Sequence, residues 1–178
     1  MATAAPQVFE VSPPSPWAWV GMGLLGGVLP LGVVAMLMLR GHAAHAPVGV
    51  LVAVFVLALV VSVSLRRRSI TLSNGMLEIR AGLYRHSLAV AQLDLERARI
   101  VDLDERTELR PFLKTGGMAM PGFKAGHFRL RGGLDKAFCL LTRTDRVLWL
   151  PQRDGKSQLL LSLERPQALL DALHSAAA

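Results

Sequence analysis

The chain has 178 residues, of which 52% are hydrophobic, 19% charged and 6% aromatic, and its formal net charge is +7. Its mean hydropathy of +0.39 is too high for an ordinary soluble domain or for a disordered chain, and it is typical of a membrane protein. The length excludes large multidomain enzymes and long repeat arrays, and the single cysteine, Cys139, excludes a disulfide framework and a cysteine-based zinc site.

Residues 1–16 contain no lysine or arginine and end in a proline-rich segment, which predicts an extended lead-in. The uncharged run 17–39 follows, and as a helix it is long enough to cross a hydrocarbon core of about 30 Å. It is longer than the apolar part of a signal peptide and has no basic segment before it, so we expect a retained transmembrane helix. Gly23 and Gly27 have the small-residue spacing that favours packing within a hairpin or a homo-oligomer.

A second uncharged run, 48–65, follows a short turn and completes a predicted transmembrane hairpin over 17–65. Arg66, Arg67 and Arg68 come directly after it, and positive charge beside a span favours the cytoplasmic side. We therefore expect a multi-pass protein of the bacterial inner membrane with both termini in the cytoplasm. Neither run contains an aspartate, glutamate, lysine or arginine, which argues against a transporter, channel or pump.

The remaining domain, 66–178, is predicted to be mainly β, because short apolar runs alternate with turn residues. Asn74-Gly75 between two apolar runs is a strong short signal of a hairpin. Pro166 begins an amphipathic stretch near the end, so we expect one C-terminal helix packed on the sheet. The strands are expected near residues 70–72, 76–80, 87–90, 99–103, 127–131, 136–142, 146–150 and 157–162.

Three segments of this domain carry a resemblance to a known family: ITLSNGMLEIRAGLYRHSLAVAQL, GGMAMPGFKAGHFRL and VLWLPQRDGKSQLLLSLERPQALLDAL. Over residues 67–178 the chain resembles the bacterial pleckstrin-homology (PH-like) domain family of membrane proteins. The resemblance implies a seven-stranded, partly open antiparallel barrel capped by one C-terminal helix. It also implies a family used mainly for binding and scaffolding. Inositol-lipid recognition is not carried over, because it depends on a basic pocket of eukaryotic relatives that the sequence does not allow us to place.

The segment 109–126 is the longest stretch without strand character, and we expect a long loop there. Its adaptable apolar side chains suit a partner-binding surface: Phe112, Met118, Met120 and Phe123. Glycines beside lysines are typical instead of an anion-binding nest, and with the basic junction they form a second candidate set: Lys114, Gly116, Gly117, Lys124, Arg66, Arg67 and Arg68. A third alternative is a crossover loop that packs on its own domain.

The sequence contains no recognisable catalytic constellation, since it lacks a P-loop, a dinucleotide fingerprint and a nucleophile elbow. His42 and His45, in the turn between the two runs, lack the further ligands that a metal site needs. Cys139 lies in an apolar run, where a small buried hydrophobe is expected rather than a reactive thiolate. Basic residues are scattered among acids, which is not the pattern of nucleic-acid binding. We expect no enzyme, no metal and no cofactor.

The sequence therefore predicts a membrane-anchored protein-interaction or scaffold module. Its partners are expected to be the lipid bilayer and another membrane or membrane-associated protein, with the hairpin raising the effective concentration of the PH-like domain near them. The alternative is a sensor of anionic lipid headgroups or of a small anionic ligand, because basic residues flank the glycine-rich segment.

Overall fold

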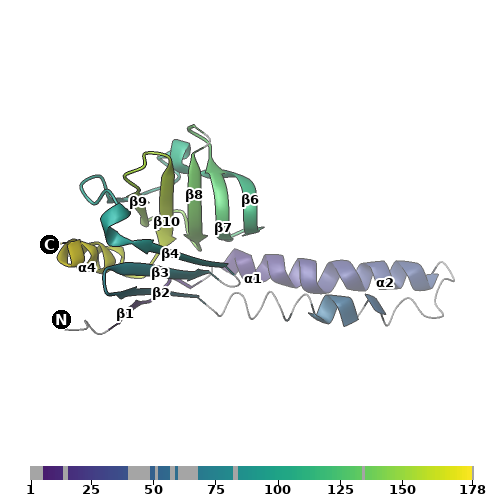
Figure 1. Cartoon of the computed structure of the whole chain (residues 1–178). Helices are drawn as coiled ribbons and strands as arrows, with labels where there is room; N and C mark the ends of the chain where they lie inside the picture. Colours follow the sequence, from purple (N-terminus) through teal and green to yellow (C-terminus); the bar gives the residue numbers. More distant parts are fainter. Residues whose placement is uncertain are drawn as a thin grey trace.

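The structure, a computed structural model, describes residues 6–13, 16–39, 49–50, 52–56, 59, 68–81, 84–133 and 135–177. These residues form a body of two β-sheets, a C-terminal helix packed against it, and a run of helical segments that leads away from it (Figure 1). The β character expected for the C-terminal part of the chain is confirmed.

The first sheet is built around the predicted hairpin. It has four antiparallel strands in the order β1-β2-β3-β4, namely β1 Gln7–Phe9, β2 Arg68–Ser73, β3 Met76–Ala81 and β4 Tyr84–Ala89. Asn74 and Gly75, between β2 and β3, have φ angles of 51° and 69°. Two positive φ angles in a two-residue turn match the twist of the strands that it joins, so the hairpin predicted from Asn-Gly is confirmed.

The second sheet departs from the prediction. Its six strands lie in the order β5-β9-β10-β8-β7-β6, namely β5 Arg99–Val101, β6 Pro111–Met120, β7 Phe123–Leu130, β8 Lys136–Leu141, β9 Val147–Pro151 and β10 Ser157–Ser162. β10 lies between β9 and β8 and runs parallel to β8. The predicted seven-stranded, wholly antiparallel barrel is therefore wrong. β8, β9 and β10 are buried along most of their length, and such apolar runs carry no alternation from which a neighbour or a direction can be predicted.

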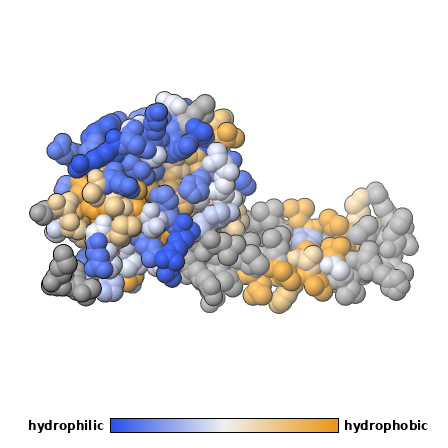
Figure 2. Space-filling model, viewed as in Figure 1, coloured by the Kyte–Doolittle hydropathy of each residue, from blue (hydrophilic) through white to orange (hydrophobic). Residues whose placement is uncertain are grey.

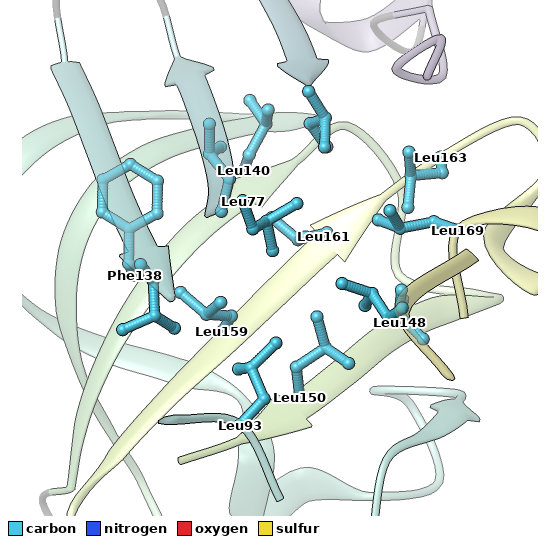
Figure 3. Packing of buried hydrophobic residues seen from close by; sticks show 14 of the residues in the cluster. Leu77, Leu93, Phe138, Leu140, Leu148, Leu150, Leu159, Leu161, Leu163 and Leu169 are labelled. Atoms are coloured by element: carbon cyan, nitrogen blue, oxygen red, sulfur yellow. The ribbon is translucent and has the colours of Figure 1, made fainter. Parts of the chain in front are cut away.

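Leucines from both sheets and from the C-terminal helix meet in one core (Figure 3). The helix, α4 Pro166–Ala177, begins at the expected proline, and its Leu169 and Leu173 are fully buried. They belong to the same cluster as Leu77 of β3 and Leu150 of β9. Burying one such side chain contributes roughly 1.5–3 kcal/mol, so this shared core holds the two sheets and α4 in one body. The predicted C-terminal helix is confirmed.

The other face of the six-stranded sheet carries a second apolar cluster. Cys139 of β8 and Leu160 of β10 belong to it, while their neighbours along each strand point into the first core. The crossover from β5 to β6 covers this face with Leu103 and Leu109, the latter in the short helix η3 Thr107–Leu109. The six-stranded sheet is therefore buried on both faces.

Residues 7–12 join the first sheet to the second. β1 pairs with β2, and beyond β1 the chain forms an isolated bridge with Leu163, just past β10. The Ser12 N–H donates to the Ser162 carbonyl with an N···O distance of 3.2 Å. The half-buried Arg68 donates from Nη1 to the Ser12 carbonyl, also at 3.2 Å. Part of the segment 1–16, expected as an extended lead-in, thus forms the strand β1 and then a connection, which we term a seam, between the two sheets.

A second seam lies at the other edge of the first sheet. After β4, the short helix η2 Val90–Gln92 brings the chain to β9. Leu93 forms an isolated bridge with Gln152, and the Asp94 N–H donates to the Pro151 carbonyl at 2.9 Å. The two sheets are therefore connected at both edges of the smaller one.

Three helical segments run end to end away from the sheets: α1 Pro16–Gly23, η1 Leu24–Val28 and α2 Leu29–Leu39 (Figure 1). Their described side chains are largely apolar and many are exposed, as Leu24, Val28 and Leu31 are (Figure 2). The high mean hydropathy of the chain thus has one of its sources in these segments, which lie outside the β body.

Among the residues that the structure describes, no helix combines the length and the apolar character needed to cross a membrane. The predicted transmembrane hairpin over 17–65 is therefore wrong. The π-helix η1 interrupts the α-helical hydrogen-bond pattern and leaves α1 and α2 with 8 and 11 residues. The predicted inner-membrane localisation with two cytoplasmic termini depended on that hairpin and is wrong as well. The prediction of the lipid bilayer as a partner depended on the same hairpin. Much of 48–65, with Arg66 and Arg67, lies outside the described residues.

The segment 109–126, expected as a long loop, instead forms most of a β-hairpin. β6 and β7 pair along most of their length. Gly117 and Gly126 face each other in this pairing, and a Cβ atom built on Gly126 would lie 2.6 Å from the Cα atom of Gly117. Gly126 also has a φ of 114°. The glycines that suggested a loop therefore allow two strands to approach closely.

Gly126→Ala is expected to lower the free energy of unfolding by at least about 2 kcal/mol, because the added methyl group would meet the backbone of β6 and the native φ is positive. Gly116→Ala is the matched control, since nothing lies within 4 Å of a Cβ atom at that position. Urea unfolding followed by circular dichroism measures both variants. Equal midpoints would contradict the close approach of the two strands.

Candidate binding site at the β6–β7 hairpin

The four apolar candidates from the sequence lie on different sides of the hairpin. Phe112 is 65% exposed. Met118 and Met120 are half-buried and pack against the core between the sheets, and Phe123 belongs to that core with only 2% exposed. The structure therefore does not bring the four side chains together, and of these four Phe112 is the one that is open to a partner.

A β-bulge turns Phe112 outward. In the register with β7, the pair formed by Pro111 is followed directly by the pair formed by Leu113, so Phe112 is the extra residue. Bulges are frequent at sheet edges, where they re-aim side chains. The guanidinium of Arg131 lies 5.7 Å from the centre of the Phe112 ring, within cation–π range. Phe112 is thus an exposed ring with a cationic neighbour.

β6 is an edge strand, and among the described residues its backbone pairs with β7 alone. Its four consecutive exposed residues run from Phe112 to Thr115. Leu113, which is 53% exposed, is an apolar residue of this surface that sequence reasoning missed. Its position next to Phe112 is the signal that could have found it. Lys114 and Arg131 add positive charge, and Figure 2 shows an apolar area bordered by hydrophilic side chains on this side of the sheet. We term residues 112–115 with Arg131 the edge patch.

The anion-binding candidates from the sequence are also separated. Gly116 and Gly117 lie inside β6, where their backbone groups belong to a strand rather than to a nest. Lys114 lies in the edge patch, whereas Lys124 lies on β7. Arg68 takes part in the seam with Ser12 and is half-buried. The members of this set that the structure describes therefore do not share one binding surface, and Arg66 and Arg67 lie outside the described residues.

A cleft of about 250 Å³ lies where the crossover from β5 meets the turn after β8. Its lining includes the buried Leu103, Phe123 and Leu141 and the polar Arg110, Lys124, Thr142 and Arg143. We term it the crossover cleft. Sequence reasoning found Phe123 and Lys124 but missed Arg110, Thr142 and Arg143. They come from separate segments, and no local pattern in the sequence brings them together.

The crossover cleft carries an excess of positive charge. The Lys124 ammonium donates to the Pro111 carbonyl with an N···O distance of 3.2 Å. Arg110 donates from Nε to the Leu103 carbonyl at 2.7 Å and forms an ion pair with Asp104. No ion pair involves Lys124 in the part of the chain that the structure describes. Its charge is therefore uncompensated by a carboxylate.

The Thr142 hydroxyl is a buried polar group without a partner. The residue is 1% exposed, and its Oγ1 atom makes no hydrogen bond within the described structure. An unpaired buried polar group costs about 1–3 kcal/mol, and native proteins contain few of them. Thr142 is among the residues that line the crossover cleft, and the hydrogen-bonding capacity of its hydroxyl is unused in the described structure.

A wider hollow of about 710 Å³ lies between η2 and the end of α4. Its charged lining is mixed, with Asp94, Glu96 and Arg153. Arg153 is already engaged, since it donates from Nε to the Leu93 carbonyl at 3.2 Å. None of the unpaired buried polar atoms of the described chain lines this hollow, which makes it the weaker candidate.

Potential metal ligands are dispersed among the residues that the structure describes. No group of three histidine, cysteine, aspartate or glutamate residues in the described ranges lies close enough to hold a metal ion. Cys139 is fully buried, as expected, and burial raises the pKa of its thiol so that the thiol stays protonated.

Two histidines flank Phe138 between the sheets. The His86 ring stacks on the Phe138 ring with centroids 4.8 Å apart, and the His127 ring meets it edge-on at 5.1 Å. The His86 Nε2 atom is buried and has no hydrogen-bond partner in the described structure. Burial, and then the charge of His127, lowers the pKa of His86. The fold therefore favours neutral His86.

Phe123→Ala is expected to lower the free energy of unfolding by about 3–5 kcal/mol, because it removes a ring from the core between the sheets. Phe112→Ala is the matched control and is expected to change it by no more than about 0.5 kcal/mol, because that ring is exposed. Denaturant unfolding measures both. A similar loss for the two variants would show that Phe112 has a structural role instead.

Stability is expected to fall as the pH drops below the ordinary histidine pKa of 6.5, because the unfolded chain then binds a proton that folded His86 resists. This contribution to stability is present above that pKa and is lost on acidification. His86→Phe keeps a ring against Phe138 and removes the titration. Its melting temperature should therefore fall less than that of the wild type between about pH 7.5 and 5.5. His174→Gln, on the exposed surface of α4, is the control, and an equal fall in all three proteins would exclude His86 as the cause.

Comparison with known proteins adds no relative: no family model, curated protein or solved structure matches the chain. The resemblance to the PH-like family therefore stays a prediction from the three sequence segments that carry it. What the protein does must be inferred from the edge patch and the crossover cleft.

Proposed function

We propose that this protein is a recognition module that binds an extended, acidic polypeptide segment of another protein at the edge patch. The observation that carries the proposal is the placement of Phe112 and Leu113, two exposed apolar side chains, on an edge strand. A sheet edge takes up an extended segment through backbone hydrogen bonds, while neighbouring side chains provide specificity. The proposal keeps the protein-interaction part of the sequence prediction and omits the membrane anchor.

Charge favours an acidic partner. The chain has a net charge of +7, and Lys114 and Arg131 border the two apolar side chains. Complementary charge at the rim of an interface speeds association and disfavours partners of the wrong sign. A segment with an apolar residue between aspartates or glutamates fits both features of the edge patch.

The shape of β6 limits how much strand can be added. Proteins protect sheet edges with prolines, charges and bulges, and the first half of β6 has Pro111, Lys114 and two register shifts. At the other end of the strand, Pro121 lies beside α1, within 3.7 Å of a Cβ atom built on Gly21. We therefore expect a short contact centred on side chains, with an affinity on the order of micromolar, rather than a long added strand.

A library of random displayed peptides, panned against the full chain, tests this function. Enriched peptides are expected to share an apolar residue flanked by acidic ones. A synthetic peptide of the enriched sequence should bind the double variant Phe112→Ser, Leu113→Ser at least about tenfold more weakly than the wild type, because buried apolar anchors carry much of the free energy of such interfaces. Fluorescence anisotropy measures the affinities.

Met76→Ser is the matched control, since Met76 is also an exposed apolar residue but lies on β3 in the other sheet. Its affinity for the peptide should equal that of the wild type. Lys114→Glu should weaken binding at low salt and have a smaller effect at high salt. The proposal fails if no sequence is enriched, or if the enriched peptides bind the double variant as tightly as they bind the wild type.

A further inference from the structure

The size and lining of the crossover cleft restrict what it can hold. A volume of about 250 Å³ is below the 300–1,000 Å³ of pockets that take drug-sized ligands. Leu103, Phe123 and Leu141 give the lining an apolar part, and the half-buried Met120 beside them has a flexible side chain that adapts to different shapes. The ligand that fits is therefore small and has an apolar body.

Lys124 and Thr142 are two polar members of the lining whose hydrogen-bonding capacity is not fully used. The Lys124 ammonium has three N–H donors and gives one to the Pro111 carbonyl, at 3.2 Å. Thr142 lines the same cleft, and its buried hydroxyl has no partner within the described structure. Both groups can donate hydrogen bonds, and charge-assisted hydrogen bonds to an anionic oxygen are the strongest of this kind. A carboxylate, with two oxygens that accept hydrogen bonds, is the ligand group that suits two such donors.

The charge balance of the lining selects a monoanion. Arg110 is paired with Asp104, and Arg143 is paired with Asp145. The charges of the two arginines are thus largely compensated, whereas that of Lys124 is not. A phosphate monoester would bring about two negative charges at neutral pH, more than the one uncompensated cation balances. A carboxylate brings one.

We propose that the crossover cleft binds a small monocarboxylate with a short aliphatic body, its carboxylate on Lys124 and Thr142. The same chemistry is present in a free short-chain acid and in the C-terminal residue of a polypeptide. The site is distinct from the edge patch, because its polar groups come from β7 and from the turn after β8.

Isothermal titration of the full chain with four probes tests the proposal. Hexanoate represents a free acid and N-acetyl-leucine represents a polypeptide C-terminus. Hexan-1-ol and N-acetyl-leucinamide are their uncharged counterparts. Saturable binding of a carboxylate, without binding of its neutral counterpart, is expected. Tighter binding of hexanoate would assign the site to free acids, and tighter binding of N-acetyl-leucine would assign it to polypeptide ends.

Two substitutions separate binding from folding. Lys124→Gln should weaken carboxylate binding about tenfold or more, because it removes a charged donor. Thr142→Val replaces the unpaired hydroxyl by a methyl group of similar size. It should weaken binding by about three- to tenfold while leaving the free protein as stable as the wild type or more stable. A purely structural role for Thr142 would not produce opposite changes in affinity and stability.

Lys136→Gln is the matched control, since Lys136 is an exposed cation at the start of β8 and does not line the cleft. It should bind the carboxylates as the wild type does. The double variant at Phe112 and Leu113 should do so too, which keeps this test independent of the proposed function. The proposal is overturned by equal binding of hexanoate and hexan-1-ol, by unchanged affinity in both Lys124→Gln and Thr142→Val, or by no saturable binding up to about 10 mM of any carboxylate.

Discussion

Both faces of the six-stranded sheet are apolar, and the need to cover both of them determines where the other elements lie. β10 shows the requirement most directly, because Leu159 and Leu161 face one core while Leu160 faces the other. The first sheet and α4 cover the first face, as Figure 3 shows for the leucines that meet there. The crossover from β5 to β6 covers the second. Each exposed leucine would cost roughly 1.5–3 kcal/mol, so neither layer is dispensable.

The crossover also creates both candidate sites. Leu103 and Leu109 fix it on the sheet, and the bond from Arg110 to the Leu103 carbonyl holds its end. From there the chain enters β6 at Pro111, on the edge of the sheet, where the bulge that follows turns Phe112 outward. The same crossover supplies one side of the cleft that holds Lys124 and Thr142. A segment required for burial thus places the groups that are available for binding.

Local features of the fold could be predicted from the sequence, and long-range ones could not. The Asn74-Gly75 turn and the helix that begins at Pro166 are encoded by neighbouring residues, and both are confirmed. β6 was missed because Gly116 and Gly117 resemble loop residues, although both lie within the strand and Gly117 allows the close approach of Gly126 on β7. The parallel pairing of β10 with β8 depends on apolar runs that fit either direction.

The candidate site shows the same division. Phe112 and Lys124 could be predicted as candidates because an aromatic ring and a lysine beside glycines each suggest a binding role without any knowledge of the fold. Thr142 was missed because a threonine at a strand end is ordinary until a fold buries its hydroxyl. The transmembrane hairpin was predicted from two uncharged runs, 17–39 and 48–65, but charge and hydropathy do not report the π-helix at 24–28 that divides the first of them.

The seam made by residues 7–12 has a consequence for the order in which the chain folds. The Ser12 carbonyl accepts from the side chain of Arg68, 56 positions away, and the Ser12 N–H donates to the Ser162 carbonyl, 150 positions away. During synthesis, β1 therefore emerges long before the residues that hold it. Contacts at such sequence separation form slowly, because a long loop must close first. β1 is thus among the last strands to be secured, and the edge of β2 that it covers stays open until then.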